Sequence, residues 1–136
     1  MDVWEYFDQK EREFRDLSLT PDREFADLFA EERGSNGQRG RIFGNLNLDS
    51  PVEAFLAVSE LVVVEENHVH REEYGYFLVV RGDEIWGYER DLSHDPPVHR
   101  HTEGHQERLE AEPVSFKEVA EMAWRYVSDV ALTEDH

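Results

Sequence analysis

The stretch between Arg41 and Asp91 constrains the fold of this chain more than any other part of the sequence. Apolar and polar residues alternate along it in runs that are separated by short turn signals. A period of two residues is typical of β-strands, and short turns join neighbouring strands in antiparallel order. The pattern therefore predicts an antiparallel β-meander. The expected strands cover residues 42–48, 58–64, 69–81 and 85–90.

Two turn signals indicate how the meander strands are joined. We expect a turn at Glu65–His68 and a two-residue hairpin loop at Gly82-Asp83. The second should be a type II′ turn, because glycine readily takes the positive φ that its first position requires. The strand over 58–64 is apolar at both odd and even positions, which predicts a central strand covered on both sides.

Helices are expected on either side of the meander. Ser115 and Glu118 form a capping box, and apolar residues then recur at helical spacing, so a C-terminal helix should close the core. Near the N-terminus we expect one helix from Trp4 to Leu17 and a second from Thr20-Pro21 to Gly34. The predicted fold is a single α+β domain over 1–136, an antiparallel β-meander sheet packed by a C-terminal helix, with a two-helix N-terminal arm over 1–33, a connector over 34–40 and a core over 41–130.

The chain is strongly acidic, with 32 Asp and Glu against 14 Lys and Arg and a net charge of −18. Such a charge opposes contact with polyanions at low ionic strength. It fits either a salt-adapted, halophilic source or a basic partner that docks on an acidic face. The first explanation is favoured because the acidic residues are spread along the chain.

Other features of the composition point to a cytoplasmic protein. The chain has no cysteine, which excludes disulfides and thiolate metal sites. It has no apolar run long enough to span a membrane, and residues 1–6 lack the pattern of a signal peptide. We therefore expect a cytoplasmic chain with no membrane association.

Six of the seven histidines lie between His68 and His105, and His99 and His101, in the segment that follows the expected meander, form the clearest pair. Residues two apart in an extended segment project to the same face, so the two imidazoles should lie together. Such a pair suits acid and base catalysis on a phosphodiester, with Arg100 stabilising the phosphate charge. Arg90 and Asp91, at the end of the preceding strand, fit either a place in the same cleft, where Asp91 would support the histidines, or an ordinary surface ion pair, which is favoured for these two residues taken alone.

Two alternatives to catalysis by this pair stay open. The imidazoles also suit a divalent metal ion, with His94, Asp95 or His105 completing the ligand shell. The spacing fixes no third ligand, however, so we predict neither a metal nor another cofactor. The segment around these histidines is also compatible with an exposed polar loop or an edge strand that has no chemical role.

The order of motifs between about residues 41 and 123 resembles the TumE-like toxin family. Arg71-x-x-Tyr74-x-Tyr76 follows a Ser-Glu strand, as in that family, and Pro97-Val98-His99-Arg100-His101 is similar to its Pro-His-His-x-His segment. The closing helix from Pro113 to Glu121 is also similar. The chain departs from the family at Phe77, where a histidine is common, and at His94-Asp95-Pro96, where the family carries a His-His pair.

The resemblance implies the toxin component of a toxin–antitoxin pair, encoded beside a helix-turn-helix antitoxin and acting on RNA. On this hypothesis His99 and His101 carry the reaction, supported by Arg100, Asp91 and Tyr76. The alternative hypothesis is a non-enzymatic acidic interaction protein, either a homodimer or a partner-binding module. A metal-dependent hydrolase is the third hypothesis.

Overall fold

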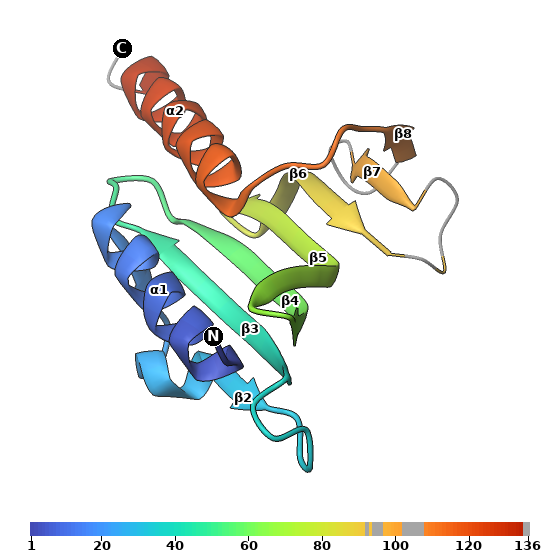
Figure 1. Ribbon diagram of the computed structural model, residues 1–136. Coiled ribbons are helices and arrows are strands. Elements are labelled where there is room, and N and C mark those ends of the chain that lie inside the picture. The colour runs from blue at the N-terminus through green and yellow to red at the C-terminus, as the bar shows by residue number, and fades with distance from the viewer. Residues whose placement is uncertain (92, 94–96, 102–107, 135–136) are drawn as a thin grey trace.

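One antiparallel sheet organises the computed structural model, which describes residues 1–91, 93, 97–101 and 108–134 (Figure 1). Its strands follow the order β1-β3-β4-β5-β6-β7-β8, and β2 also pairs with β3. From β3 onward each strand pairs with the next one along the chain, so the predicted meander is confirmed. The meander consists of β3 (Arg39–Leu48), β4 (Ala54–Glu65), β5 (His68–Val80), β6 (Asp83–Arg90), β7 (Val98–His101) and β8 (Arg108–Glu110).

The two meander turns are both built from residues with positive φ. Glu66 and Asn67 have φ of 49° and 65° and join β4 to β5, at the predicted position. Arg81 and Gly82 have φ of 53° and 83° and join β5 to β6. The expected II′ turn at Gly82-Asp83 is wrong in two respects. The loop lies one residue earlier, and positive φ at both of its positions defines a type I′ turn. This turn type matches the right-handed twist of the flanking strands.

The helix α1 (Val3–Asp16) confirms the first predicted helix. The second predicted helix is wrong. The chain instead forms β1 (Leu19–Pro21), a 3₁₀ turn η1 (Phe25–Leu28) and β2 (Phe29–Glu31). Both short strands pair with β3 along its outer edge, where its backbone N–H and C=O groups need partners. Hydrogen bonding to these backbone groups outweighs the helical preference that the spacing of the apolar residues indicates. Pro21 is tolerated because β1 is an edge strand.

The C-terminal helix α2 (Phe116–Glu134) begins at the predicted capping box. The Oγ of Ser115 accepts a hydrogen bond from the backbone N–H of Glu118 at 3.1 Å and donates one to its carboxylate at 3.0 Å. The chain thus has the predicted α+β fold. Within the described residues, no helix combines the length and apolar character needed to cross a membrane.

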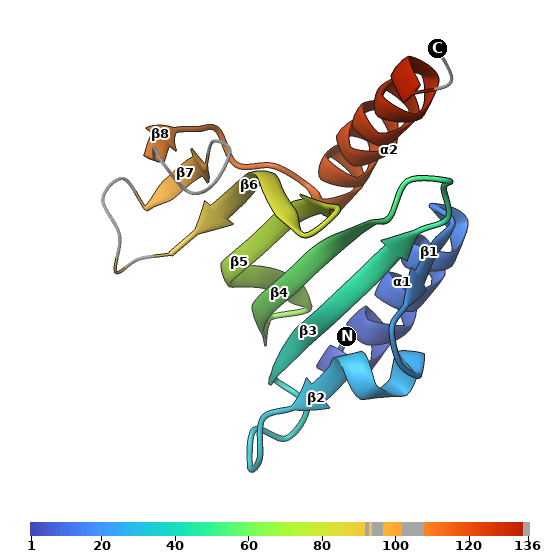
Figure 2. The ribbon, with the colours of Figure 1, turned by 180° about the vertical axis from the view of Figure 1, so that it is seen from behind.

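Both helices pack against the same face of the sheet, which we call the helical face (Figures 1 and 2). Phe116 of α2 contacts Phe14 of α1 and Tyr76 of β5, with ring centroids 4.9 Å and 5.4 Å apart. In Figure 2, seen from behind, the strands lie in front of α1. We call this opposite side the open face.

On β4, Val58 on the helical face is buried whereas Ser59 on the open face is exposed, so the predicted cover on both sides is wrong for this part of the strand. It holds at the end of the strand, where Val62, Val63 and Val64 are all buried. The predicted central position is confirmed, because β4 lies between β3 and β5.

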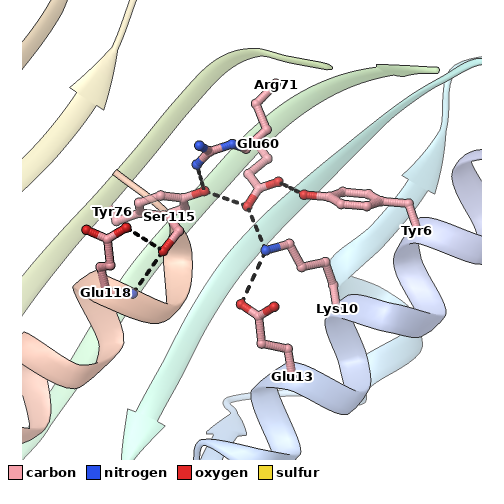
Figure 3. Close-up of polar contacts among 8 residues, drawn as sticks. All are labelled: Tyr6, Lys10, Glu13, Glu60, Arg71, Tyr76, Ser115 and Glu118. Carbon is pink, nitrogen blue, oxygen red and sulfur yellow. Dashed lines mark hydrogen bonds and ion pairs between the residues drawn. The ribbon is translucent and has the colours of Figure 1, made fainter. Parts of the chain in front are cut away.

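A buried polar network ties α1 to the helical face (Figure 3). Glu60 of β4 accepts hydrogen bonds from the hydroxyls of Tyr6 at 2.5 Å and Tyr76 at 2.6 Å. Arg71 donates to the Tyr76 hydroxyl at 2.9 Å, and the Lys10 ammonium lies 3.9 Å from the Glu60 carboxylate. These donors satisfy a carboxylate that has no exposed side-chain surface. Burial, with the nearby Glu60 charge, raises the pKa of Tyr6 and of Tyr76 well above the ordinary value of 10.0.

We expect the free energy of unfolding to fall as the pH rises above about 10, the ordinary pKa of tyrosine. In the folded state the Tyr6 and Tyr76 phenols keep their protons, whereas the unfolded chain releases them and is thereby favoured. Each phenol contributes a slope of up to about 1.4 kcal/mol per pH unit. Urea unfolding between pH 8 and 11.5 measures this slope, and it should be shallower in a Tyr6→Phe/Tyr76→Phe variant. An equal slope in both proteins would contradict the assignment.

Candidate active site

The pairing of β6 with β7 places both predicted histidines on the open face. Glu89 of β6 lies directly opposite His99, and Gly87 lies opposite His101. Residues opposite each other in an antiparallel pair project to the same face. Both histidines thus belong to a strand, between β6 and the short edge strand β8, and their expected pairing in an extended segment is confirmed.

Glu89, His99 and His101 bring their polar atoms into one group, which we call the histidine–glutamate cluster. The two Nε2 atoms lie 2.8 Å apart. The Glu89 Oε1 lies 3.6 Å from the His99 Nε2, and its Oε2 lies 3.7 Å from the His101 Nε2. His99 and His101 are only 0% and 2% exposed, whereas the Glu89 side chain is 15% exposed. Glu89 is therefore the member of the cluster that faces outward.

Phe77 and Gly87 fix the position of the His101 ring. The Phe77 ring meets the His101 ring edge to face, with centroids 5.4 Å apart and planes at 86°. A Cβ added to Gly87 would lie 2.1 Å from the Phe77 Cδ1, so any larger residue there would displace the phenyl ring. Glycine at this position lets the ring lie across the strand and support the imidazole.

A hollow of about 510 Å³ adjoins the cluster on the open face. Glu89 and Phe77, both in contact with the histidines, form part of its lining. The hollow follows one cross-strand row in which Ser59 and Gly75 lie between Phe43 and Glu89. Because these two middle residues are small, the row is low in its centre and higher at its ends.

The lining of the hollow combines apolar, basic and acidic side chains. Phe43 is 68% exposed, which is a large apolar surface for an aromatic residue in a sheet. Arg41 is also exposed and makes no ion pair or side-chain hydrogen bond to any residue that the structure describes. Glu73 and Asp91 add negative charge beside Glu89. A ligand bound here would meet an aromatic platform and the Arg41 guanidinium at one end, and carboxylates with the half-buried Arg90 at the other.

The structure brings together only some of the residues predicted to support the histidines. The Asp91 carboxylate accepts hydrogen bonds from the backbone and hydroxyl of Ser93 at 2.9 Å and 2.6 Å, and Asp91 lines the hollow as expected. Arg100 lies opposite Tyr88 and projects to the helical face, because it alternates with the two histidines. Tyr76 also lies on the helical face, in the Glu60 network. The expected grouping of Arg100 and Tyr76 with the histidine pair is therefore wrong.

Glu89 is the member of the cluster that the sequence did not single out. It stands in an ordinary alternating strand, and only the register between β6 and β7 places it beside His99. The other predicted metal ligands, His94, Asp95 and His105, lie outside the described residues.

The geometry limits what the cluster can do chemically. An Nε2–Nε2 distance of 2.8 Å fits one hydrogen bond between the rings, with one imidazole donating and the other accepting. It leaves no space for a phosphate group between the two rings, so they cannot act from opposite sides of a phosphodiester. The cluster can instead act as a unit, by sharing a proton with Glu89 or by holding one metal ion.

Comparisons with known proteins add no relative for this chain. No protein-family model matches it, and neither the curated proteins nor the solved structures give a match.

We expect Gly87→Ala to destabilise the protein by about 1–3 kcal/mol, the usual cost of overpacking. The added methyl group would clash with the Phe77 ring. Urea unfolding measures the effect, and the cost should shrink when Gly87→Ala is made in a Phe77→Leu background. Ser59→Ala, on the exposed part of the same face, is the matched control and should change stability by less than about 0.5 kcal/mol. An equal cost of Gly87→Ala in both backgrounds would show that Phe77 is not the cause.

Proposed function

We propose that the protein is an RNA-acting enzyme of the TumE-like toxin type, with the histidine–glutamate cluster as its reaction centre. The observation that carries the proposal is that Glu89 lines a hollow on the helix-free side of the sheet, with its carboxylate 3.6 Å and 3.7 Å from the two buried imidazoles. Imidazole and carboxylate groups are the side chains that most often transfer protons near neutral pH. Their concentration beside a hollow is typical of a reaction centre.

The open face supports single-stranded RNA as the substrate. Unpaired bases bind to proteins chiefly by stacking on aromatic side chains, and an uncovered antiparallel sheet is a common platform for this. Phe43 offers an exposed ring, and the adjacent Arg41 offers a guanidinium to the phosphate backbone. Strands lie about 4.8 Å apart, so the three steps from Phe43 to Glu89 span roughly 14 Å. A base stacked on Phe43 would thus direct the neighbouring chain toward the cluster.

The net charge of −18 determines how such binding would depend on salt. A protein that neutralises many phosphates loses affinity steeply as salt rises, by a slope of about −0.7 per phosphate for single strands. Here Arg41 is the exposed cation of the hollow, and Glu73 and Asp91 oppose a phosphate. Binding by stacking predicts a slope close to −0.7 in total, which is a loss of affinity of only about fivefold for a tenfold rise in salt.

The proposal includes a neutralising partner, a helix-turn-helix antitoxin encoded beside this chain. A basic protein surface would complement the acidic chain, and by covering Phe43 and the hollow it would block access to the cluster.

The burial of the two imidazoles favours a second candidate function, a non-enzymatic interaction protein. His99 and His101 are almost fully buried, so the cluster can also be a structural contact between β6 and β7. The open face would then dock a protein partner and carry no reaction. The two functions make different predictions for a variant without the imidazoles. Its expression in cells should no longer be toxic if the protein is the enzyme.

We expect inducible expression of the chain in a bacterium to arrest growth and degrade RNA, and a His99→Ala/His101→Ala variant to do neither. The change removes both proton-transfer groups of the cluster. Growth curves and electrophoresis of total RNA measure the two effects. Coexpression of the neighbouring antitoxin should restore growth.

The chain contains its own matched control for this experiment. His68 and His70 form a second His-x-His pair, exposed at the start of β5, and His68→Ala/His70→Ala should stay toxic. Glu89→Gln, a change of similar shape, should lower toxicity without unfolding the protein. Full toxicity of a folded His99→Ala/His101→Ala variant would refute the enzymatic proposal and leave the interaction protein.

We expect Arg41→Ser/Phe43→Ser to weaken binding of single-stranded RNA by at least about tenfold, since stacking contributes about 1–3 kcal/mol per base. Fluorescence anisotropy with a labelled oligoribonucleotide measures the affinity of the purified protein. Leu132→Ser is the control, because Leu132 is another exposed apolar residue (63%), on α2 and away from the open face. Equal affinities for all three proteins would exclude the open face as the RNA site.

A further inference from the structure

We propose that Glu89, His99 and His101 form a binding site for one divalent transition-metal ion such as Zn²⁺. Each residue offers one ligand atom, and these atoms lie within 4.8 Å of one another. Two imidazole nitrogens and one carboxylate oxygen are the protein ligands of many catalytic zinc sites, whose remaining position is taken by water.

The distances within the cluster are close to those that a metal ion requires. In a tetrahedral site with bonds of about 2.0–2.2 Å, ligand atoms lie roughly 3.3–3.6 Å apart. The Glu89 carboxylate lies 3.6 Å from the His99 Nε2 through Oε1 and 3.7 Å from the His101 Nε2 through Oε2, and the two Nε2 atoms are 2.8 Å apart. Separating the two rings by about 0.5 Å, and turning the Glu89 carboxylate so that one oxygen approaches both nitrogens, would bring the three ligand atoms near the ideal separation. Small side-chain rotations can supply this change.

The sheet holds the three ligands in place before any ion binds. Glu89 lies directly opposite His99 in the β6–β7 pair, and His101 follows two residues later on the same face. The edge-to-face contact with Phe77 sets the plane of the His101 ring. A site built on paired strands costs little conformational entropy to assemble, which favours tight binding.

The cluster also has the open side that a catalytic metal needs. Glu89 is partly exposed toward the hollow, whereas both imidazoles are enclosed. A water molecule on the ion would therefore face the hollow, and such a bound water loses a proton near neutral pH. This use of the ion rests on the proposed RNA-acting function, but the site itself does not. A shared metal ion also explains how two imidazole rings that are too close together to flank a phosphodiester can take part in one reaction.

Cobalt titration of the purified, untagged protein tests the site. After dialysis against a chelator, Co²⁺ should bind with a stoichiometry of one and give the visible absorption of a cobalt ion with nitrogen ligands. Zn²⁺ should then displace it. His99→Ala, His101→Ala and Glu89→Gln should each weaken binding by at least about 100-fold, since even changes around a ligand cost 10–100-fold.

His68→Ala/His70→Ala is again the matched control, because it removes an exposed His-x-His pair and should leave binding unchanged. Glu89→Gln keeps both imidazoles, so it reports on the site even where an alanine variant fails to fold. Absence of the cobalt spectrum and of heat on Zn²⁺ addition, or equal binding by the cluster variants, would overturn the proposal. The Nε2–Nε2 contact would then be a hydrogen bond alone.

The experiment separates the metal site from the proposed function because it contains no RNA. One bound Co²⁺ in a protein that neither degrades RNA nor arrests growth would uphold the site and reject the function. RNA degradation that survives chelation, in a protein that binds no Co²⁺, would uphold the function and reject the site.

Discussion

The two-residue period of the β-strand separates core packing from site chemistry throughout this molecule. Each meander strand gives alternate side chains to opposite faces of the sheet, and α1 and α2 cover only one of them. The helical face receives apolar residues such as Val58 and Leu78, which are fully or almost fully buried. The same strands present Phe77 and Glu89 to the open face. Surface chemistry can therefore change at one set of positions while the packing of the other set is preserved.

The Glu60 network and the histidine–glutamate cluster show what this separation permits. Glu60 on the helical face is surrounded by groups that donate, two phenols and an ammonium, so its charge is fixed in place (Figure 3). Glu89 on the open face instead meets two imidazole nitrogens, which can either donate or accept. The first arrangement holds α1 to the sheet, whereas the second can exchange a proton or take up a cation.

Local signals in the sequence predict most of the fold but only part of the site. The meander and α2 follow from strand alternation and a capping box, which involve residues close along the chain. The apolar residues in the segment over 19–31 have helical spacing, yet the segment pairs with β3. No local sequence pattern indicates that the backbone groups at the edge of β3 require hydrogen-bond partners. Strand alternation alone predicts that Arg100 and His99 project to different faces of the sheet. Glu89, in contrast, is identified only by the register between β6 and β7.

The position of β7 near one end of the sheet means that a metal ion in the cluster would also stabilise the sheet locally. Among the described strands, β7 is held by β6 on one side and by the three-residue β8 on the other. An ion held jointly by β6 and β7 would act as a crosslink in a chain that has no cysteine to form one. The local stability of this outer ribbon would then depend on metal concentration, whereas the strands beneath α1 and α2 would keep theirs.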